Sequence, residues 1–162
     1  GDGGAQRSLG GIVAGFYNSS AISNPQKCVI SGCKNYGTIY NKNATSGTTT
    51  STTGGIGGIV GKPFLQAHGI GVTISNCTNS GDIVSSGRTG GIVGTLNEAW
   101  QNVGKYSTVS GCTNTGTIYG TDGSRGQIYG IMGTNASDPD KDNILSNNQE
   151  NGTLKTYDEY SK

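Results

Sequence analysis

Residues 74–83 read ISNCTNSGDI, and the string decides the fold because it recurs. Two close copies stand elsewhere in the chain: ISGCKNYGTI at 30–39 and VSGCTNTGTI at 109–118. A second phrase precedes each copy in a similar form: GGIVA at 10–14, GGIVG at 57–61 and GGIVG at 90–94. A fourth, degenerate copy begins at Gly126 and ends in LSNNQENGTL. Self-similarity at this period is typical of solenoids and propellers.

Each apolar run in the repeat is short, β-branched and bounded by Gly, Asn or Ser, which favours strands over helices. GGIV, VTIS and GDIV are expected to form three short strands, and Val72 and Ile74 point to the same side of the second. Bends between three strands close a coil, and coils stack in parallel about 4.8 Å apart. A propeller blade needs four strands per repeat, so a propeller fits this three-strand repeat less well than a solenoid does. The sequence predicts an all-β chain, a parallel β-helix (β-solenoid) of about four three-strand coils.

A single domain over residues 1–162 is expected, with four approximate repeats: 10–56, 57–89, 90–125 and 126–155. Apolar residues make up 31% of the chain and charged residues 13%, against about 45–50% and 25% in ordinary domains. A net charge of +1 without a basic cluster argues against nucleic-acid binding. The chain has no run of about 18 apolar residues, so direct membrane insertion is not predicted.

Cys33, Cys77 and Cys112 share one repeat position and are expected to form an inward column, with Cys28 also pointing inward. Two disulfides are the alternative for an even cysteine count. Stacked strands hold Cβ atoms about 4.8 Å apart, beyond the usual 3.5–4.5 Å of a disulfide, which favours free buried thiols. A metal site is disfavoured because the chain has no CxxC pair and its one histidine, His68, lies in another segment.

Asn35, Asn79 and Asn114 form a second column, each at an expected bend. An asparagine side chain can satisfy backbone groups of its own turn. A glycine follows two residues later in each copy, at Gly37, Gly81 and Gly116, where positive φ or close approach is expected.

The variable insert follows the GGIVG phrase in every copy, so stacking predicts one row of inserts along a corner. Inserts of repeat proteins often form the binding face. The predicted binding residues are aromatic or lie beside an aromatic: Trp100, Glu98, Asn97, Tyr17, Phe64 and Tyr106. The alternative is that these aromatics fold inward and cover the edge of the coil.

Asp138, Asp140 and Asp142 alternate as in calcium loops, which makes them a weak calcium candidate. The loop lacks the glycine expected at the sixth position and has Gln149 in place of the bidentate glutamate, so a solvated loop is the alternative. No other cofactor is expected. The chain has no GxSxG or HExxH motif and no obvious facing pair of acids, so no enzyme activity is predicted.

GGIVG followed by ISNCTNSGDI resembles the GLUG-motif repeat of bacterial secreted and cell-surface proteins, over residues 10 to about 120 and more weakly over 126–154. The resemblance implies an exported, non-catalytic module, a piece of a longer surface protein that acts in adhesion or as a stalk. A host or matrix glycan or protein is then the expected partner. The alternatives are a carbohydrate-binding or polysaccharide-processing β-helix and, ranked last, an ice-binding face, because Asp82 interrupts the column of Thr38, Thr117 and Thr153.

Overall fold

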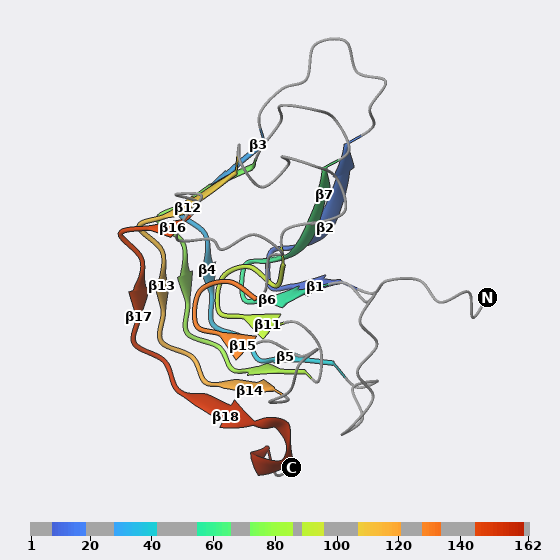
Figure 1. The fold of residues 1–162 in the computed structure, drawn as a ribbon, viewed down its shortest axis with the longest axis vertical. Helices are drawn as coiled ribbons and strands as arrows, with labels where there is room; N and C mark the ends of the chain where they lie inside the picture. The colour runs from blue at the N-terminus through green and yellow to red at the C-terminus, as the bar shows by residue number, and fades with distance from the viewer. Residues whose placement is uncertain are drawn as a thin grey trace, which may run out of the picture.

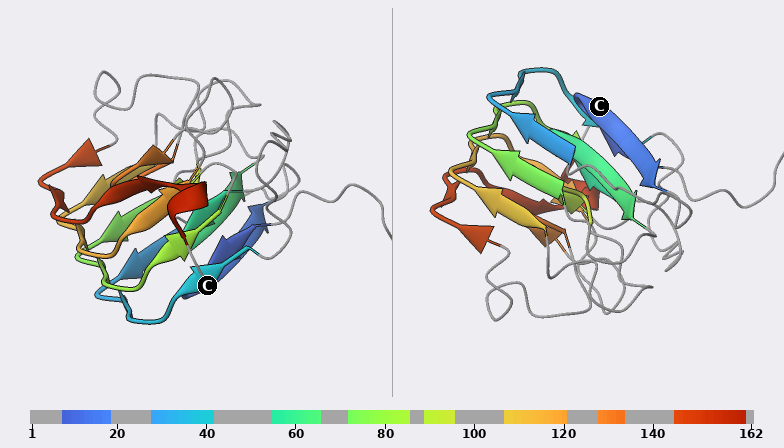
Figure 2. Two further views of the ribbon diagram at one scale, coloured as in Figure 1. Left: turned by 90° about the horizontal axis from the view of Figure 1, so that it is seen from below. Right: turned by 90° about the horizontal axis from the view of Figure 1, so that it is seen from above.

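The structure is a computed structural model in which four coils stack into a solenoid (Figures 1 and 2). It describes the chain in these ranges: 8–18, 28–41, 55–65, 72–85, 89–95, 107–120, 128–133 and 145–160. All pairing between coils is parallel, as expected for a chain that winds in one direction.

The strands of the first coil are β1 (Leu9–Gly10), β2 (Val13–Asn18), β3 (Cys28–Ser31), β4 (Lys34–Asn35) and β5 (Ile39–Tyr40). The second coil has β6 (Ile56–Gly57), β7 (Val60–Leu65), β8 (Val72–Ser75), β9 (Thr78–Asn79) and β10 (Ile83–Val84). The third has β11 (Thr89–Gly90), β12 (Thr108–Ser110), β13 (Thr113–Asn114) and β14 (Ile118–Gly120). The fourth has β15 (Ile128–Tyr129), β16 (Leu145–Ser146), β17 (Gln149–Glu150) and β18 (Leu154–Thr156), followed by the 3₁₀ helix η2 (Tyr157–Glu159).

Equivalent strands of successive coils form 4-stranded sheets, in the orders β1-β6-β11-β15, β3-β8-β12-β16, β4-β9-β13-β17 and β5-β10-β14-β18. A 2-stranded sheet joins β2 to β7. The register places the repeated strings above one another, with Ile30 beside Ile74 and Ile74 beside Val109. The predicted parallel solenoid of four coils is confirmed.

Each coil has more short strands than the three expected, because the asparagine segment is a strand of its own. One residue with positive φ separates it from the preceding strand in every coil. In each repeat this residue lies between the serine that ends the preceding strand and the cysteine position: Gly32 (φ 64), Asn76 (φ 53), Gly111 (φ 61) and Asn147 (φ 52). Glycine and asparagine are the residues that adopt this left-handed conformation most readily, so their alternation at this one position was a readable signal for a corner.

The fourth copy of the glycine phrase lies three residues later than the sequence alignment placed it. Tyr129, rather than Gly126, pairs with Gly90, and Met132 bridges to Val93. The phrase of the fourth coil is therefore YGIMG at 129–133. Burial explains the shift, since this register puts Ile131 and Met132, 8% and 2% exposed, into the core.

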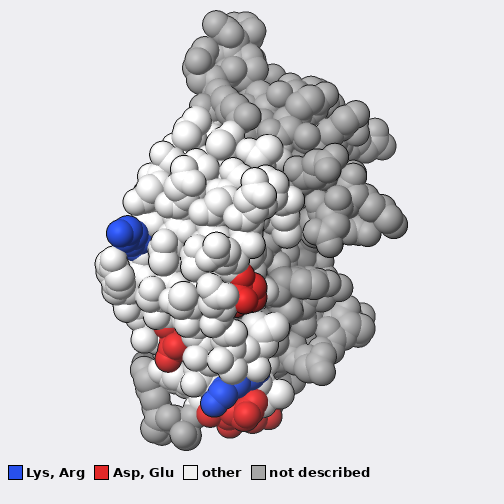
Figure 3. Space-filling model, turned by 90° about the vertical axis from the view of Figure 1, so that its left-hand side faces the viewer, with Lys and Arg blue, Asp and Glu red and all other residues white. Residues whose placement is uncertain are grey.

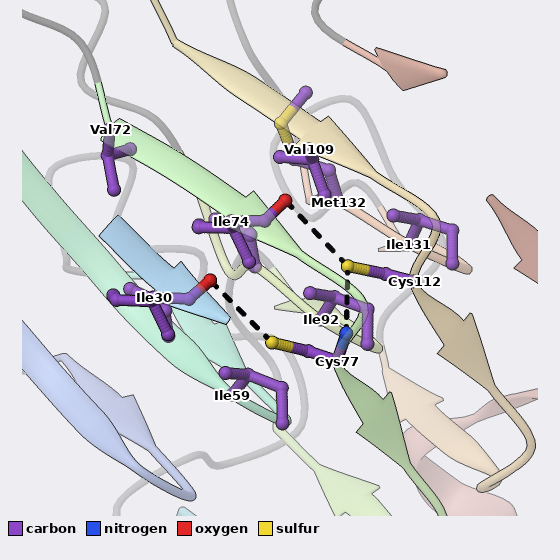
Figure 4. Close-up of a cluster of buried hydrophobic side chains, with 12 residues drawn as sticks. Ile30, Ile59, Val72, Ile74, Cys77, Ile92, Val109, Cys112, Ile131 and Met132 are labelled. Carbon is purple, nitrogen blue, oxygen red and sulfur yellow. Dashed lines mark hydrogen bonds between the residues drawn. The ribbon is translucent and has the colours of Figure 1, made fainter. Parts of the chain in front are cut away.

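The core is a set of aliphatic columns that run through the coils (Figure 4). Ile59 and Ile92 are fully buried in one column, and Ile74 and Val109 in another. Each side chain packs on its equivalents above and below, so one coil alone buries little, and stability depends on neighbours. Burial of such a side chain contributes about 1.5–3 kcal/mol.

The segment after β18 turns back and covers the outer face of the sheet that contains β14, β10 and β5. The Tyr160 ring lies 5.7 Å from the Tyr40 ring and 4.9 Å from the Tyr119 ring. Val84 occupies the register position between those two tyrosines and is fully buried. Burial, followed by a hydrogen bond with Tyr40, raises the pKa of Tyr157. This cover lies beyond the last repeat, where the repeat pattern carries no information about packing.

Candidate functional site

The row of inserts begins and ends at stacked backbone positions. Val13 pairs with Val60, and Val60 with Val93, where the chain leaves the glycine phrase. The chain returns at β3, β8, β12 and β16, which form one sheet. The described ends of all four inserts are therefore held in two parallel rows, while most of each insert lies outside the described residues.

Two of the predicted binding residues lie side by side in backbone register. Tyr17 in β2 pairs with Phe64 in β7. The other four, Trp100, Glu98, Asn97 and Tyr106, lie outside the described residues, and so do the calcium candidates Asp138, Asp140 and Asp142. The structure thus brings together one pair of the six. Within the described ranges, no group of three potential metal ligands occurs, and no helix is long and apolar enough to cross a membrane.

The face of the coils seen in Figure 3 carries few charges. The charged residues of the described ranges are Lys34, Lys62, Asp82, Glu150, Lys155, Asp158 and Glu159. Neighbouring hydroxyls bond along the stack: Thr115 Oγ1 lies 3.1 Å from Ser80 Oγ, and Thr108 Oγ1 lies 3.4 Å from Thr73 Oγ1. Tyr36, directly after β4, has 71% of its surface exposed.

Three of the described carboxylates are engaged in backbone hydrogen bonds that stabilise the coils. Asp82 Oδ1 accepts the Thr117 N–H at 3.1 Å, which explains why an acid interrupts the threonine column. Glu150 Oε1 accepts the Gly152 N–H at 2.9 Å. Glu159 Oε2 accepts the Thr156 N–H at 2.7 Å, and this bond lowers the pKa of Glu159. These acids therefore have a structural role.

The cysteine column lies inside the coils as free thiols (Figure 4). Cys77 and Cys112 are fully buried, whereas Cys28 and Cys33 are half-buried. The Cys77 thiol donates to the Ser75 carbonyl oxygen at 3.2 Å, and Cys112 repeats this bond to Ser110 at 3.4 Å. The Cys112 sulfur in turn accepts the Cys77 N–H at 3.5 Å. The thiols thus act as small polar links between coils.

Thiol chemistry should follow this burial. The hydrogen bond with Cys112 and burial raise the pKa of Cys77, and burial raises the pKa of Cys28 and Cys33. The hydrogen bond with Cys77 lowers the pKa of Cys112 to about 7, but Cys112 is fully buried and out of reach of a reagent. Because the thiolate is the reactive form, we expect slow alkylation of the native protein near neutral pH, with Cys28 and Cys33 reacting first and faster as the pH rises. Mass spectrometry after denaturation without reductant should find all four cysteines alkylated. Recovery of none would show two disulfides instead.

The asparagine column forms a continuous ladder of side-chain amides. Asn35 Nδ2 donates to Asn79 Oδ1 at 2.8 Å, and Asn79 Nδ2 donates to Asn114 Oδ1 at 2.8 Å. Each amide also donates to the carbonyl oxygen of the glycine two residues later, as Asn79 does to Gly81 at 2.8 Å. Asn79 and Asn114 are fully buried. The predicted bend-satisfying role is confirmed, and the ladder adds direct bonds between coils.

The glycines that follow the ladder are required by close approach and not by positive φ. A Cβ at Gly81 would overlap the Gly37 carbonyl oxygen, and a Cβ at Gly116 would overlap that of Gly81. The backbone of one coil therefore passes directly against the next at this position. Of the two explanations open at the sequence level, the structure selects close approach.

The fourth coil ends both columns with a different side chain. Asn148 replaces cysteine, and its Oδ1 accepts the Cys112 N–H at 2.9 Å while its Nδ2 donates to the Val109 carbonyl at 2.8 Å. Glu150 replaces asparagine and accepts the Asn114 amide at 3.0 Å. Both replacements keep the bonds toward the third coil.

Comparison with known protein families, with curated proteins and with solved structures finds no match to this chain. The resemblance to GLUG repeats consequently remains a prediction from the repeated strings.

Proposed function

We propose that the chain is a non-catalytic repeat module of a bacterial secreted or cell-surface protein, which acts in adhesion or as a surface stalk. One observation supports this most directly: the coils hold the ends of four inserts of different sequence in two parallel rows. A regular scaffold that presents variable segments in line is the arrangement by which repeat proteins form extended binding faces. The expected partner is a host or matrix glycan or protein.

The polar side chains of the repeat itself support a scaffold role. The asparagines bond one another and the backbone, the buried thiols bond carbonyl oxygens, and Asp82 and Glu150 accept backbone N–H groups. These groups hold the coils together and leave recognition to the insert edge.

Carbohydrate binding is the second candidate, and the outer face favours it. Hydroxyl and amide groups with little charge, beside the exposed ring of Tyr36, suit a neutral sugar chain better than an anionic partner. This alternative places the contact on the sheet that contains β4, β9, β13 and β17 rather than on the insert edge.

Trp100→Ala tests the proposed function. We expect the variant to lose binding to arrays of host glycans and immobilised matrix proteins while its melting temperature stays nearly unchanged, because an aromatic ring on the binding edge serves the partner. Tyr36→Ala is the matched control, and loss of glycan binding in that variant alone would favour the outer face. A loss of about 3–5 kcal/mol of stability in Trp100→Ala would place the ring in a core instead and would contradict a binding role for Trp100 on the insert edge.

A further inference from the structure

The two ends of the solenoid differ in how they terminate the buried columns. At the C-terminal coil, Glu150 ends the amide ladder with a group that only accepts, and Asn148 ends the cysteine column. At the N-terminal coil, Asn35 and Cys33 are the same residue types as in the middle of the stack. The first coil therefore has the side chains of an internal coil at an end position.

The ladder has a direction, and among the described residues its first acceptor has no partner from another coil. Each of the three asparagines donates to the next coil, and Asn79 and Asn114 also accept from the coil before them. Asn35 Oδ1 accepts only the N–H of Gly37, at 3.3 Å, among the residues that the structure describes. An amide donor from a preceding coil would complete the pattern.

The backbone of the first coil shows the same incomplete pattern. Thr78 N–H donates to the Cys33 carbonyl and Ser80 N–H to the Asn35 carbonyl, both at 2.8 Å, and the third coil repeats both bonds to the second. The equivalent N–H groups of the first coil belong to Lys34 and Tyr36. In the described ranges these two N–H groups have no acceptor.

Gly37 and Ile12 add steric and apolar evidence. A Cβ at Gly37 would meet only the Asn35 Oδ1, at 3.8 Å, whereas the equivalent Cβ in later coils would overlap a backbone oxygen. Nothing described in this chain therefore requires a glycine at position 37. Ile12 is 47% exposed, although the equivalent Ile59 and Ile92 are fully buried.

We propose that this open end, formed by Ile12, Cys33, Asn35, Gly37 and the N–H groups of Lys34 and Tyr36, binds one further coil of the same repeat, carried ahead of β1 by the same polypeptide. The asparagine amide of that coil donates to Asn35 Oδ1. Its carbonyl groups at the cysteine and asparagine positions accept from Lys34 and Tyr36, and its glycine carbonyl packs against Gly37. The contact continues the existing interface between coils.

A second copy of the chain fits this end poorly. Stacking the fourth coil of one molecule on the first coil of another would set the Glu150 carboxylate against Asn35 Oδ1. Both groups are acceptors, so neither can donate to the other, and the contact would bury the carboxylate against a second acceptor, which is costly.

The test adds the missing coil in register. In the extended protein, a copy of residues 55–88 is joined directly before Leu9. Leu9 and Thr89 occupy the same register position, because both pair with Ile56. The added coil therefore leads into Leu9 as residue 88 leads into Thr89 in the present chain. We expect the amide hydrogens of Lys34 and Tyr36 to exchange roughly 100-fold more slowly in the extended protein than in the present chain. Gly37→Ala should be tolerated in the present chain and should abolish that protection in the extended one.

Two controls make the test specific. Asn79→Asp within the added copy removes the amide donor at nearly unchanged shape, and the protection should fall. A second extension joins a copy of residues 89–127 before Leu9, in the same register but with a different connecting segment. It replaces the first extension if that protein does not fold. The proposal is overturned if Lys34 and Tyr36 are already protected in the present chain, if that protection depends on protein concentration, as docking of a second copy would require, or if neither extension changes it.

Discussion

Asn79→Ala should be among the most destabilising single substitutions in the chain, with an expected loss of about 3–5 kcal/mol in the free energy of unfolding. The side chain is fully buried and lies in the middle of the ladder. Its removal leaves the Asn35 amide, the Gly81 carbonyl and Asn114 Oδ1 each without one bond. A buried polar group that loses its partner costs about 1–3 kcal/mol. Denaturant unfolding followed by circular dichroism measures the loss.

Asn151→Ala is the matched control for this substitution. Asn151 lies one residue beyond the ladder position of the fourth coil, and its exposed side chain makes no hydrogen bond among the described residues. Its backbone N–H bond to the Asn114 carbonyl, 2.8 Å long, survives the change. We expect a change within about 0.5 kcal/mol. Equal losses in the two variants would show that the ladder contributes nothing beyond ordinary asparagine packing.

Gly116→Ala should cost about 3 kcal/mol or more, because the new methyl group meets backbone and cannot be accommodated by a side-chain movement. The Cβ would overlap the Gly81 carbonyl oxygen and would lie 3.0 Å from Asn79 Nδ2. Relief requires the second and third coils to separate, which also lengthens the ladder bond between Asn79 and Asn114. Thermal unfolding should show a large fall in the melting temperature.

Gly37→Ala is the control at the same position of the repeat. The first coil leaves space for the methyl group, with only Asn35 Oδ1 at 3.8 Å. Where alanine fits the native backbone, it restricts the unfolded chain and stabilises by up to about 1 kcal/mol. A similar loss in both variants would mean that backbone conformation, and not contact between coils, requires these glycines.

Much of the scaffold could be predicted from the repeated strings. Strict recurrence of Ile, Cys, Asn and Gly at fixed offsets means that equivalent residues stack, and stacking alone gives the parallel register, the inward columns and the row of insert ends. The cysteines are free, as the strand spacing predicted. The left-handed corner at Asn76 and the close contacts of the glycines became clear only from the geometry.

The sequence failed where its pattern weakens. In the fourth copy the alignment followed the letters GQIYG, whereas the structure follows burial and places Ile131 and Met132 in the core. The segments 126–130 and 129–133 have similar local patterns, so either could form the glycine phrase without a local penalty. Only the pairing of the second segment with the third coil, such as Met132 with Val93, distinguishes them. Of the candidate binding residues, only Tyr17 and Phe64 lie in the described coils, where their backbones pair, and the predicted binding role stays a prediction.

The sequence by itself determined that this chain winds into stacked parallel coils, because a periodic string of β-branched residues, bends and glycines has that one way to bury its apolar side chains. Only the tertiary structure decided how the stack ends. Glu150 terminates the ladder, Tyr160 packs against Tyr40 and Tyr119, and Asn35 keeps an acceptor that no described coil fills. A periodic pattern specifies what lies above and below each residue, whereas an end is defined by a neighbour that is absent or different, and that information is not periodic.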